Sequence, residues 1–256
     1  MAERLDRRGF GLRLTAGAAS LLLSGCGDEA SERPWVRQLL DKAEGLTYWM
    51  QRRVLPHNAL AREYDEADLS PQFRANGSTD PEDEDYRRLA ANDFTDWRLE
   101  VGGLVEHPAR FSLADLRALP GRTQITRHDC VEGWSCIGKW AGTPLATLLQ
   151  RAGVRPEARF VMFHCADTME DSADRYYESI GFGDAFHPQT ILAYDMNDAP
   201  LSVAHGAPLR LRVERQLGYK QAKYVMAIEL VDSYSHIGHG QGGFWEDRGY
   251  EWYAGI

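Results

Sequence analysis

Apolar residues recur at helical spacing early in the chain. Between Pro34 and Val54 the apolar positions are mostly three to four residues apart, at Trp35, Leu39, Leu40, Ala43, Leu46 and Met50. This spacing places them along one side of a helix. The pattern therefore predicts one amphipathic helix that leads into the folded domain.

The pattern then changes from polar loop to strands. Residues 56–85 are polar and include Pro71, Gly77 and Pro81, which predicts a long ordered loop. From Asp96 onward, short apolar or alternating runs are typical of β-strands. The expected strands are Trp97–Val101, Thr123–Asp129, Arg159–Phe163, Thr190–Tyr194, Pro208–Val213 and Tyr224–Val231.

Only short helices are expected between these strands. Ser112 and Asp115 form a capping-box pattern, and the helix that they begin should end before Pro120. Thr143 is expected as the N-cap of a second helix, with proline at its first position and Gly153 at its end. Short helices among short strands indicate an α+β fold with mixed sheets.

The first 25 residues are typical of an export signal. Arg7 and Arg8 precede an apolar, small-residue run over 14–23, as in a twin-arginine signal. The run is too short to span a membrane comfortably. Leu23-Ser24-Gly25-Cys26 resembles a lipobox, so Cys26 is expected to carry lipid; the alternative is a plain cleaved signal. In both cases we expect a periplasmic protein, and no other segment is expected to span a membrane.

Composition excludes several classes of protein. The net charge of −9 argues against general nucleic-acid binding. The sequence contains neither GxGxxG nor GxxxxGK[ST], so no nucleotide-binding loop is expected, and it lacks CxxCH, so covalent haem is not expected. Four cysteines in 256 residues are too few for a disulfide scaffold.

The candidate chemistry is concentrated in three segments. In Arg127-His128-Asp129-Cys130, a cysteine follows a strand-like run, and its thiolate would suit a soft or borderline metal. Further on, residues 205–210 and 218–223 offer cations and glycines of the kind that hold a bound anion. Together they predict a cysteine-ligated metal on a phosphate-bearing cofactor.

These segments resemble a known family. The run from Arg127 to Trp134 is similar to the segment of the sulfite oxidase superfamily that carries the molybdenum-ligating cysteine. Residues 193–210 and Gly218-Tyr219-Lys220 with Lys223 are similar to two further signatures. The most similar branch is the periplasmic one that includes the catalytic subunit of methionine-sulfoxide reductase. The resemblance covers about residues 69–232 and implies a sulfite-oxidase-like molybdopterin-binding fold.

The resemblance also implies roles for particular residues. Cys130 would be the catalytic residue and the protein ligand of molybdenum. The molybdopterin, with its phosphate, would be bound by residues at the family's contact positions: Asn76, Cys165, His205, Arg210, Gln221, Ala222 and Lys223. The chain departs from the pattern at Cys165, where the family often has threonine, and at His205, where parts of the family have asparagine. Arg127 and His128 are expected to favour the thiolate.

The implied organisation is a signal at 1–25, a helix and linker at 26–68, and a molybdopterin-binding oxidoreductase domain at 69–256. The implied function is oxygen-atom transfer, with sulfoxide reduction as the first expectation, on a small or protein-bound sulfoxide. Sulfite oxidation is the alternative, which the lack of an arginine cluster for an anionic substrate disfavours. We expect a monomer that needs an external electron partner, such as a membrane haem protein.

Other interpretations of the same residues remain open at this stage. A zinc site from His128, Cys130, Cys136, His164 and Cys165 has the right ligand types but the spacing of no common module. A metal-free binding protein is another alternative. Cys136 is expected to be a buried, inert neighbour rather than a disulfide partner of Cys130. Cys165 could equally be structural or border the site. The acidic run Asp167, Glu170 and Asp171 is expected to be a loop face, with a place at the rim of the site as the alternative. His187 is a candidate for a pocket role, and the aromatic C-terminal segment is expected to pack against the domain.

Overall fold

The computed structural model describes residues 33–54, 58–169 and 172–256. It divides into two units, residues 1–54 and 55–256, which are described separately. The described part of the first unit is one helix, α3 (Pro34–Val54), which confirms the helix predicted there. Among the described helices, none is both long and apolar enough to cross a bilayer. The predicted export signal and Cys26 lie outside the described residues.

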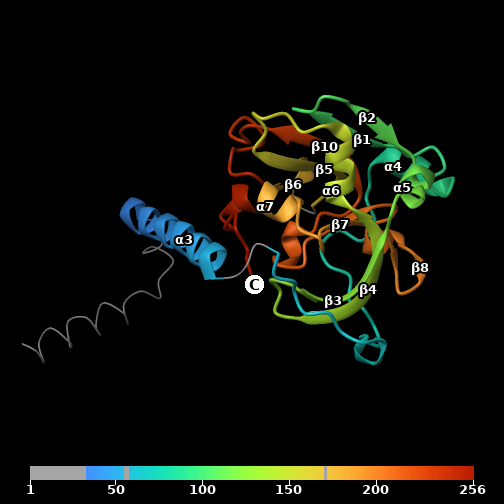
Figure 1. The fold of residues 1–256 in the computed structure, drawn as a ribbon, viewed down its shortest axis with the longest axis horizontal. Helices are drawn as coiled ribbons and strands as arrows, with labels where there is room; N and C mark the ends of the chain where they lie inside the picture. Colours follow the sequence, from blue (N-terminus) through green and yellow to red (C-terminus); the bar gives the residue numbers. More distant parts are fainter. Residues whose placement is uncertain (1–32, 55–57, 170–171) are drawn as a thin grey trace, which may run out of the picture. The chain divides into compact units, whose positions relative to one another are not determined.

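The second unit is built on two five-stranded sheets (Figure 1). The first sheet has the order β2 (Ala109–Phe111), β1 (Leu99–Gly103), β10 (Val225–Val231), β5 (Phe160–Thr168), β6 (Arg175–Gly181). The second has the order β3 (Arg122–Asp129), β4 (Ser135–Pro144), β7 (Ile191–Met196), β8 (Ala199–Pro200), with β9 (Arg210–Arg212) also paired with β7. Neighbouring strands are antiparallel except β1 and β10, which are parallel. The mixed sheets confirm the α+β class.

The helices of this unit are short. They are α4 (Glu84–Ala91), α5 (Leu113–Ala118), α6 (Leu145–Ala152) and α7 (Phe182–Ala185), with 3₁₀ turns η1 (Glu66–Asp68), η2 (Val203–His205), η3 (Gly218–Lys220) and η4 (Glu246–Arg248). The capping box predicted at Ser112 is confirmed, because its hydroxyl accepts from the Asp115 amide and the Asp115 carboxylate accepts from the Ser112 amide. Gly153 ends α6, as predicted.

Two local expectations were wrong in detail. Thr143 is the penultimate residue of β4, and its hydroxyl donates to the Leu116 carbonyl at 2.9 Å, so the N-cap of α6 is Pro144 instead. The segment 56–85 is mostly irregular, but it contains η1 and the first residues of α4. Asp83 caps α4 by accepting from the Tyr86 amide at 2.9 Å.

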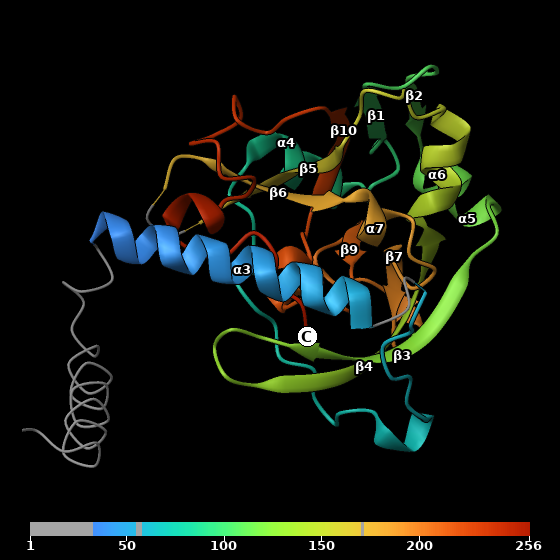
Figure 2. The same ribbon diagram turned by 60° about the vertical axis from the view of Figure 1, so that its left-hand side comes forward.

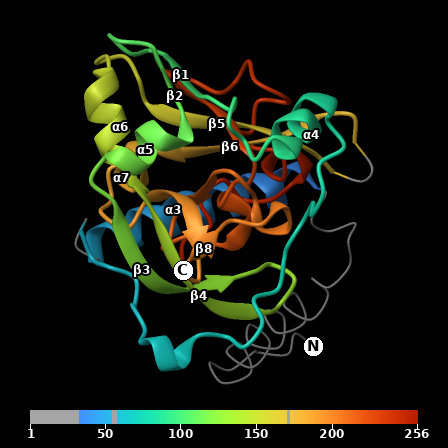
Figure 3. The ribbon, with the colours of Figure 1, turned by 90° about the vertical axis from the view of Figure 1, so that its right-hand side faces the viewer.

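The long hairpin β3–β4 curves away from the first sheet, and the chain from β8 to η3 lies between them in the views of Figures 2 and 3. Apolar side chains of both sheets fill the space around that segment. The larger core includes Trp97, Phe163 and Leu211, and a smaller one includes Phe73 and Trp140. The anion-binding segments predicted from the sequence therefore run through the middle of the unit.

Candidate active site

A cavity of about 290 Å³ brings together segments that are far apart in the sequence. It receives residues from the loop before α4, the β3–β4 turn, β5, β6, η3 and the C-terminal segment. The lining residues are Asn76, Gly77, Ser78, Cys130, Val131, Glu132, Asp167, Met169, Tyr176, Gly218, Tyr219, Gln221, Ala222, Lys223, Trp245 and Tyr250. Five of the residues predicted for the site, including Cys130, are among them.

Cys130 is presented by the tight turn that joins β3 to β4. Its amide donates to the Trp134 carbonyl at 2.9 Å, and its carbonyl accepts from the Gly133 amide at 3.1 Å. Gly133 has φ +83, a left-handed conformation that favours glycine. The thiol is half-buried and free, and burial raises its pKa. A metal ion would reverse that preference, because coordination removes the thiol proton.

The expected help from Arg127 and His128 is wrong. The Arg127 guanidinium is engaged by the Asp129 carboxylate, with 3.0 Å between Nε and Oδ2. His128 is fully buried, and burial together with Arg212 and Arg210 lowers its pKa well below the usual value. Its Nδ1 accepts from Arg212 Nη1 at 3.0 Å, which places the ring proton on Nε2. The imidazole is thus neutral and gives the Cys130 thiolate no positive charge.

Arg210 is a buried cation whose donors are only partly used. Its side chain is fully buried, and Nη1 donates to the His205 carbonyl at 3.0 Å. Its Nε and Nη2 are buried and have no partner. Burial and the neighbouring Arg212 lower its pKa, which is the expected response of a cation without a counter-ion. Two parallel guanidinium donors without a partner match the oxygens of a phosphate.

Lys223 lies beside Arg210. A Cβ placed on Gly206 would come within 2.9 Å of the Lys223 side chain and 3.3 Å of Arg210, so only glycine allows the two cations to come so close. The Lys223 ammonium donates to the carbonyl of Ser78, and to that of Ala204 at 3.2 Å. Burial, followed by the charge of Arg210, lowers its pKa to about 7.

Polar atoms without partners also occur among the lining residues. Gln221 donates its side-chain amide to the carbonyls of Val213 and Gln216, but its Oε1 is buried without a partner. Asp167 has a buried, unpartnered Oδ1, and burial raises its pKa to about 7. Of the acidic run considered in the sequence, Asp167 therefore borders the site, whereas Glu170 and Asp171 lie outside the described residues.

Three predicted cofactor contacts are not among the lining residues: Arg210, which lies beside the lining residue Lys223, and His205 and Cys165. His205 has both ring nitrogens engaged, with Ser202 Oγ at 2.8 Å from Nδ1 and the Phe73 carbonyl at 3.2 Å from Nε2. Cys165 lies within β5, where it is buried, rather than after a strand. Asp167, two residues further along the same strand, is the residue that reaches the cavity.

The aromatic C-terminal segment forms part of the cavity wall, which the expectation of simple packing missed. Trp245 and Tyr250 are stacked with ring centroids 5.2 Å apart, and Tyr219 meets Tyr250 edge-on at 5.2 Å. Tyr219 follows Gly218, where an added Cβ would lie 3.2 Å from the Asp129 carbonyl. The aromatic wall therefore begins next to the turn that carries Cys130.

A buried ion cluster holds this wall in place. The Lys220 ammonium donates to Glu178 Oε1 at 2.6 Å and to Glu246, and all three side chains are at most 1% exposed. Lys220 belongs to η3, Glu178 to β6, and Glu246 is adjacent to Trp245. The cluster thus ties the cavity loop, the first sheet and the C-terminal segment together.

The described residues do not form the zinc site considered as an alternative, and Cys136 and His187 have other surroundings than expected. No group of three or more His, Cys, Asp or Glu among them is placed to hold a metal, which contradicts the zinc-site interpretation. Cys136 is half-buried and free, so it is neither the buried neighbour expected nor a disulfide partner. His187 is buried, its Nε2 donates to the Ala59 carbonyl at 3.0 Å, and it does not line the cavity.

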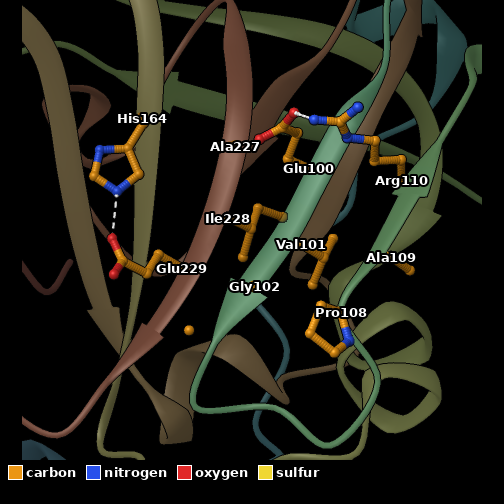
Figure 4. Close-up of a pocket in the computed structure, with 11 residues that line it drawn as sticks. Glu100, Val101, Gly102, Pro108, Ala109, Arg110, His164, Ala227, Ile228 and Glu229 are labelled. Atoms are coloured by element: carbon orange, nitrogen blue, oxygen red, sulfur yellow. Dashed lines mark hydrogen bonds and ion pairs between the residues drawn. The ribbon is translucent and has the colours of Figure 1, made fainter.

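A second hollow lies over β1, β10 and β5 (Figure 4). Its polar side chains are paired with each other, as Arg110 with Glu100 and His164 with Glu229, the latter at 2.9 Å between Nε2 and Oε2. It has no cysteine, and no buried unpartnered side-chain atom lies among its lining residues. Its chemistry does not suit a metal cofactor.

The cavity around Cys130 has the chemistry that a metal cofactor needs. It offers a free thiol as a soft ligand and, beside the cavity, two adjacent cations for a phosphate. The buried Arg210 Nε and Nη2 and the Gln221 Oε1 need hydrogen-bonding partners that the protein does not supply. A pterin with a phosphate provides acceptors for the guanidinium and donors for the amide oxygen.

Comparison with known proteins identifies the class. The family model described as the oxidoreductase molybdopterin binding domain matches residues 87–237, which is more than half of the chain. The chain belongs to this family and is a molybdopterin-dependent oxidoreductase of the sulfite-oxidase-like fold. The cofactor and the fold implied by the sequence resemblance are thereby confirmed.

Three individual proteins show which members of the family this chain is similar to. The chain is 38% identical over 250 residues to the proposed protein-methionine-sulfoxide reductase subunit YedZ1 of Azospira oryzae, covering 97% of this chain and 87% of the relative. It is 35% identical over 145 residues to the protein-methionine-sulfoxide reductase catalytic subunit MsrP of Xanthomonas axonopodis, covering 53% of this chain and 45% of that subunit. Among solved structures, the sulfane dehydrogenase SoxCD of Paracoccus pantotrophus aligns with a TM-score of 0.50 and 27% identity, over 54% of this chain and 39% of that one.

Proposed function

We propose that this oxidoreductase reduces sulfoxides to thioethers, with free or protein-bound methionine sulfoxide as the substrate class. The sulfoxide oxygen leaves as water, and the reaction consumes two electrons and two protons. The names of the YedZ1 and MsrP relatives support this assignment.

The observation that carries the proposal is the lining of the cavity beside Cys130. Apolar and aromatic side chains dominate there, including Met169, Trp245 and Tyr250. Two carboxylates, Glu132 and Asp167, also face it, and the described lining residues include no arginine. Sulfite carries negative charge and would find no arginine among the described lining residues, whereas a sulfoxide is neutral and its alkyl groups suit an aromatic wall.

Each proposed cofactor residue has a physical role. Cys130 would ligate molybdenum, while Arg210 and Lys223 would hold the phosphate. Gln221, Ala222 and Asn76 would contact the pterin, and the predicted roles of His205 and Cys165 remain predictions. When bound, the molybdenum cofactor supplies two-electron oxygen-atom transfer. The protein orients the substrate, and the aromatic wall excludes water from it.

We further propose that the enzyme is exported to the periplasm, is anchored by lipid on Cys26, and acts as a monomer. Its electrons would come from an external donor, such as a membrane haem protein. The sequence signal at residues 1–26 supports the location. Mass spectrometry of the protein isolated from membranes tests the lipid directly, with Cys26→Ser as the comparison.

The test of function begins with metal content. The protein made in a host that synthesises molybdopterin should contain molybdenum, measured by elemental analysis. With a reduced viologen as electron donor, it should reduce methionine sulfoxide, and with ferricyanide as electron acceptor it should not oxidise sulfite. Sulfite oxidation without sulfoxide reduction would contradict the proposal.

Cys130 is tested against a matched cysteine. Cys130→Ser should abolish turnover. In the cofactor-free protein it should leave the thermal unfolding midpoint within a few degrees of that of the wild type, because the thiol is only half-buried. Cys136→Ser, six residues away and also half-buried, should retain activity. Equal activity of the two variants would show that Cys130 is not the ligand.

A further inference from the structure

The described residues expose an unusual concentration of apolar surface on α3. Of the eleven large hydrophobic side chains exposed in the described chain, six belong to this one helix. They include Trp35, Leu46, Trp49, Met50 and Val54, which are 50–74% exposed. A soluble protein gains nothing from such a surface unless a partner covers it.

These residues are ordered along the helix. Trp35, Leu46 and Trp49 lie at intervals of eleven and three residues, and Met50 lies one turn after Leu46. At 3.6 residues per turn they share one side, and Lys42 and Arg53 fall at the same angular position. Both cations are exposed, and the Arg53 guanidinium lies 5.3 Å from the Trp49 ring centroid. The face is therefore apolar with tryptophans and cations within it.

The charge of the helix points to an anionic partner. The 21 residues contain four cations, Arg37, Lys42, Arg52 and Arg53, but only two acids, Asp41 and Glu44. The whole chain has a net charge of −9, so the helix is a cationic segment in an acidic protein. Tryptophan, leucine and basic residues on one amphipathic helix suit the boundary between headgroups and acyl chains of a bilayer.

The place of α3 in the sequence also favours a membrane as its partner. Seven residues, 27–33, separate Cys26 from the first residue of α3. A chain of seven residues reaches at most about 25 Å. If Cys26 carries lipid, α3 begins within that distance of the membrane surface.

We propose that α3 is a membrane-surface helix, lying in the plane of an anionic phospholipid bilayer with Trp35, Leu46, Trp49 and Met50 inserted. Its length of about 30 Å would be parallel to the surface, since its charges prevent it from spanning the bilayer. The side chains of Lys42 and Arg53 reach the headgroups while their aliphatic stems lie along the apolar face. The helix thereby adds a second, non-covalent attachment to the membrane.

The experiment separates the helix from the lipid anchor. It uses residues 26–256 with Cys26→Ser, which retains every described residue and removes the acylation site. Flotation with vesicles of phosphatidylglycerol and phosphatidylcholine should recover bound protein, and pure phosphatidylcholine vesicles should recover much less. The difference between the two should decrease as salt is raised.

The apolar face is tested with two matched leucines. Leu46 and Leu60 are both 56% exposed, but only Leu46 lies on α3. Leu46→Glu should lower the vesicle partition coefficient by about tenfold or more, whereas Leu60→Glu should change it by less than about twofold. Lys42→Glu with Arg53→Glu should remove the preference for anionic vesicles. All variants should keep the unfolding midpoint and molybdenum content of the parent protein.

A second readout reports insertion itself. Brominated acyl chains should quench tryptophan fluorescence on vesicle binding, and Trp35→Phe with Trp49→Phe should remove that quenching. Equal binding of the Leu46→Glu and Leu60→Glu proteins would overturn the proposal. So would a complete absence of vesicle binding.

Discussion

At the scale of single residues, the site is defined by groups that lack a partner in the protein. Arg210, His128 and Gln221 each bury a polar atom with no hydrogen bond, although most buried polar groups in proteins are satisfied. Such atoms cost free energy in the cofactor-free protein. The binding of a polar ligand would recover that cost, so the cofactor should contribute strongly to stability.

Asp167 gives a pH-dependent prediction for the cofactor-free protein. Burial raises its pKa from 3.8 to about 7, so the folded state binds a proton that the unfolded state has released. This group therefore reduces stability progressively as the pH rises from about 4 to about 7. In urea unfolding, Asp167→Asn should gain about 2 kcal/mol relative to the wild type between pH 5 and pH 7.5. The exposed Glu157→Gln should show no such gain, and a flat difference for Asp167→Asn would contradict the prediction.

At the scale of elements, the sequence predicted those helices and strands whose own residues favour that structure. The helix α5 was predicted from its capping box, and β3, β5, β7 and β10 from apolar runs. By contrast, β4 was missed because glycines interrupt it. A Cβ on Gly138 would lie 3.0 Å from the Phe73 ring, and one on Gly142 would lie 2.3 Å from the Leu192 carbonyl. Tertiary contacts demand these glycines, and they weaken the local signal for a strand.

The strand β6 was missed for a related reason. It carries Glu178, which is fully buried. A buried carboxylate is stable in a strand only with a partner, and here the partner is Lys220, which is distant in the sequence. The candidate site shows the same division. Cys130 and Lys223 could be predicted from their motifs, but Asp167, Trp245 and Tyr250 reach the cavity only through the fold.

The capping box of α5 gives the prediction at this scale. Ser112→Ala should reduce the free energy of unfolding by about 1 kcal/mol, since it removes the acceptor of the Asp115 amide at 3.1 Å. Asp115→Ala should also lower the stability, because it removes the acceptor of the Ser112 amide. Urea unfolding of the double variant should show less than the sum of the two losses. Full additivity would mean that the two bonds act independently.

At the scale of the whole molecule, the cavity depends on contacts between distant parts of the chain. Lys220, Glu178 and Glu246 join the cavity loop, the first sheet and the C-terminal segment without exposure to water. Burial raises the pKa of Glu178, and the two carboxylates surround a single ammonium. Loss of the ammonium would leave two acids buried without a counter-charge.

Lys220→Met should therefore destabilise the fold by about 3–5 kcal/mol, measured by urea unfolding. Lys139 is a matched control, because it also bridges two carboxylates, Glu66 and Asp198, but both of these are exposed. Lys139→Met should have a much smaller effect in the same measurement, because exposed ion pairs contribute little to stability. Similar losses for the two variants would show that burial of the cluster is not what makes it important.

The aromatic wall has a consequence for the order of events during biosynthesis. Cys130 leaves the ribosome long before Trp245 and Tyr250, yet all three border the same cavity. A nascent chain that ends before residue 250 contains Cys130 but lacks Tyr250, so one wall of its cavity is incomplete. Cofactor insertion into the complete cavity should consequently follow release of the whole chain from the ribosome.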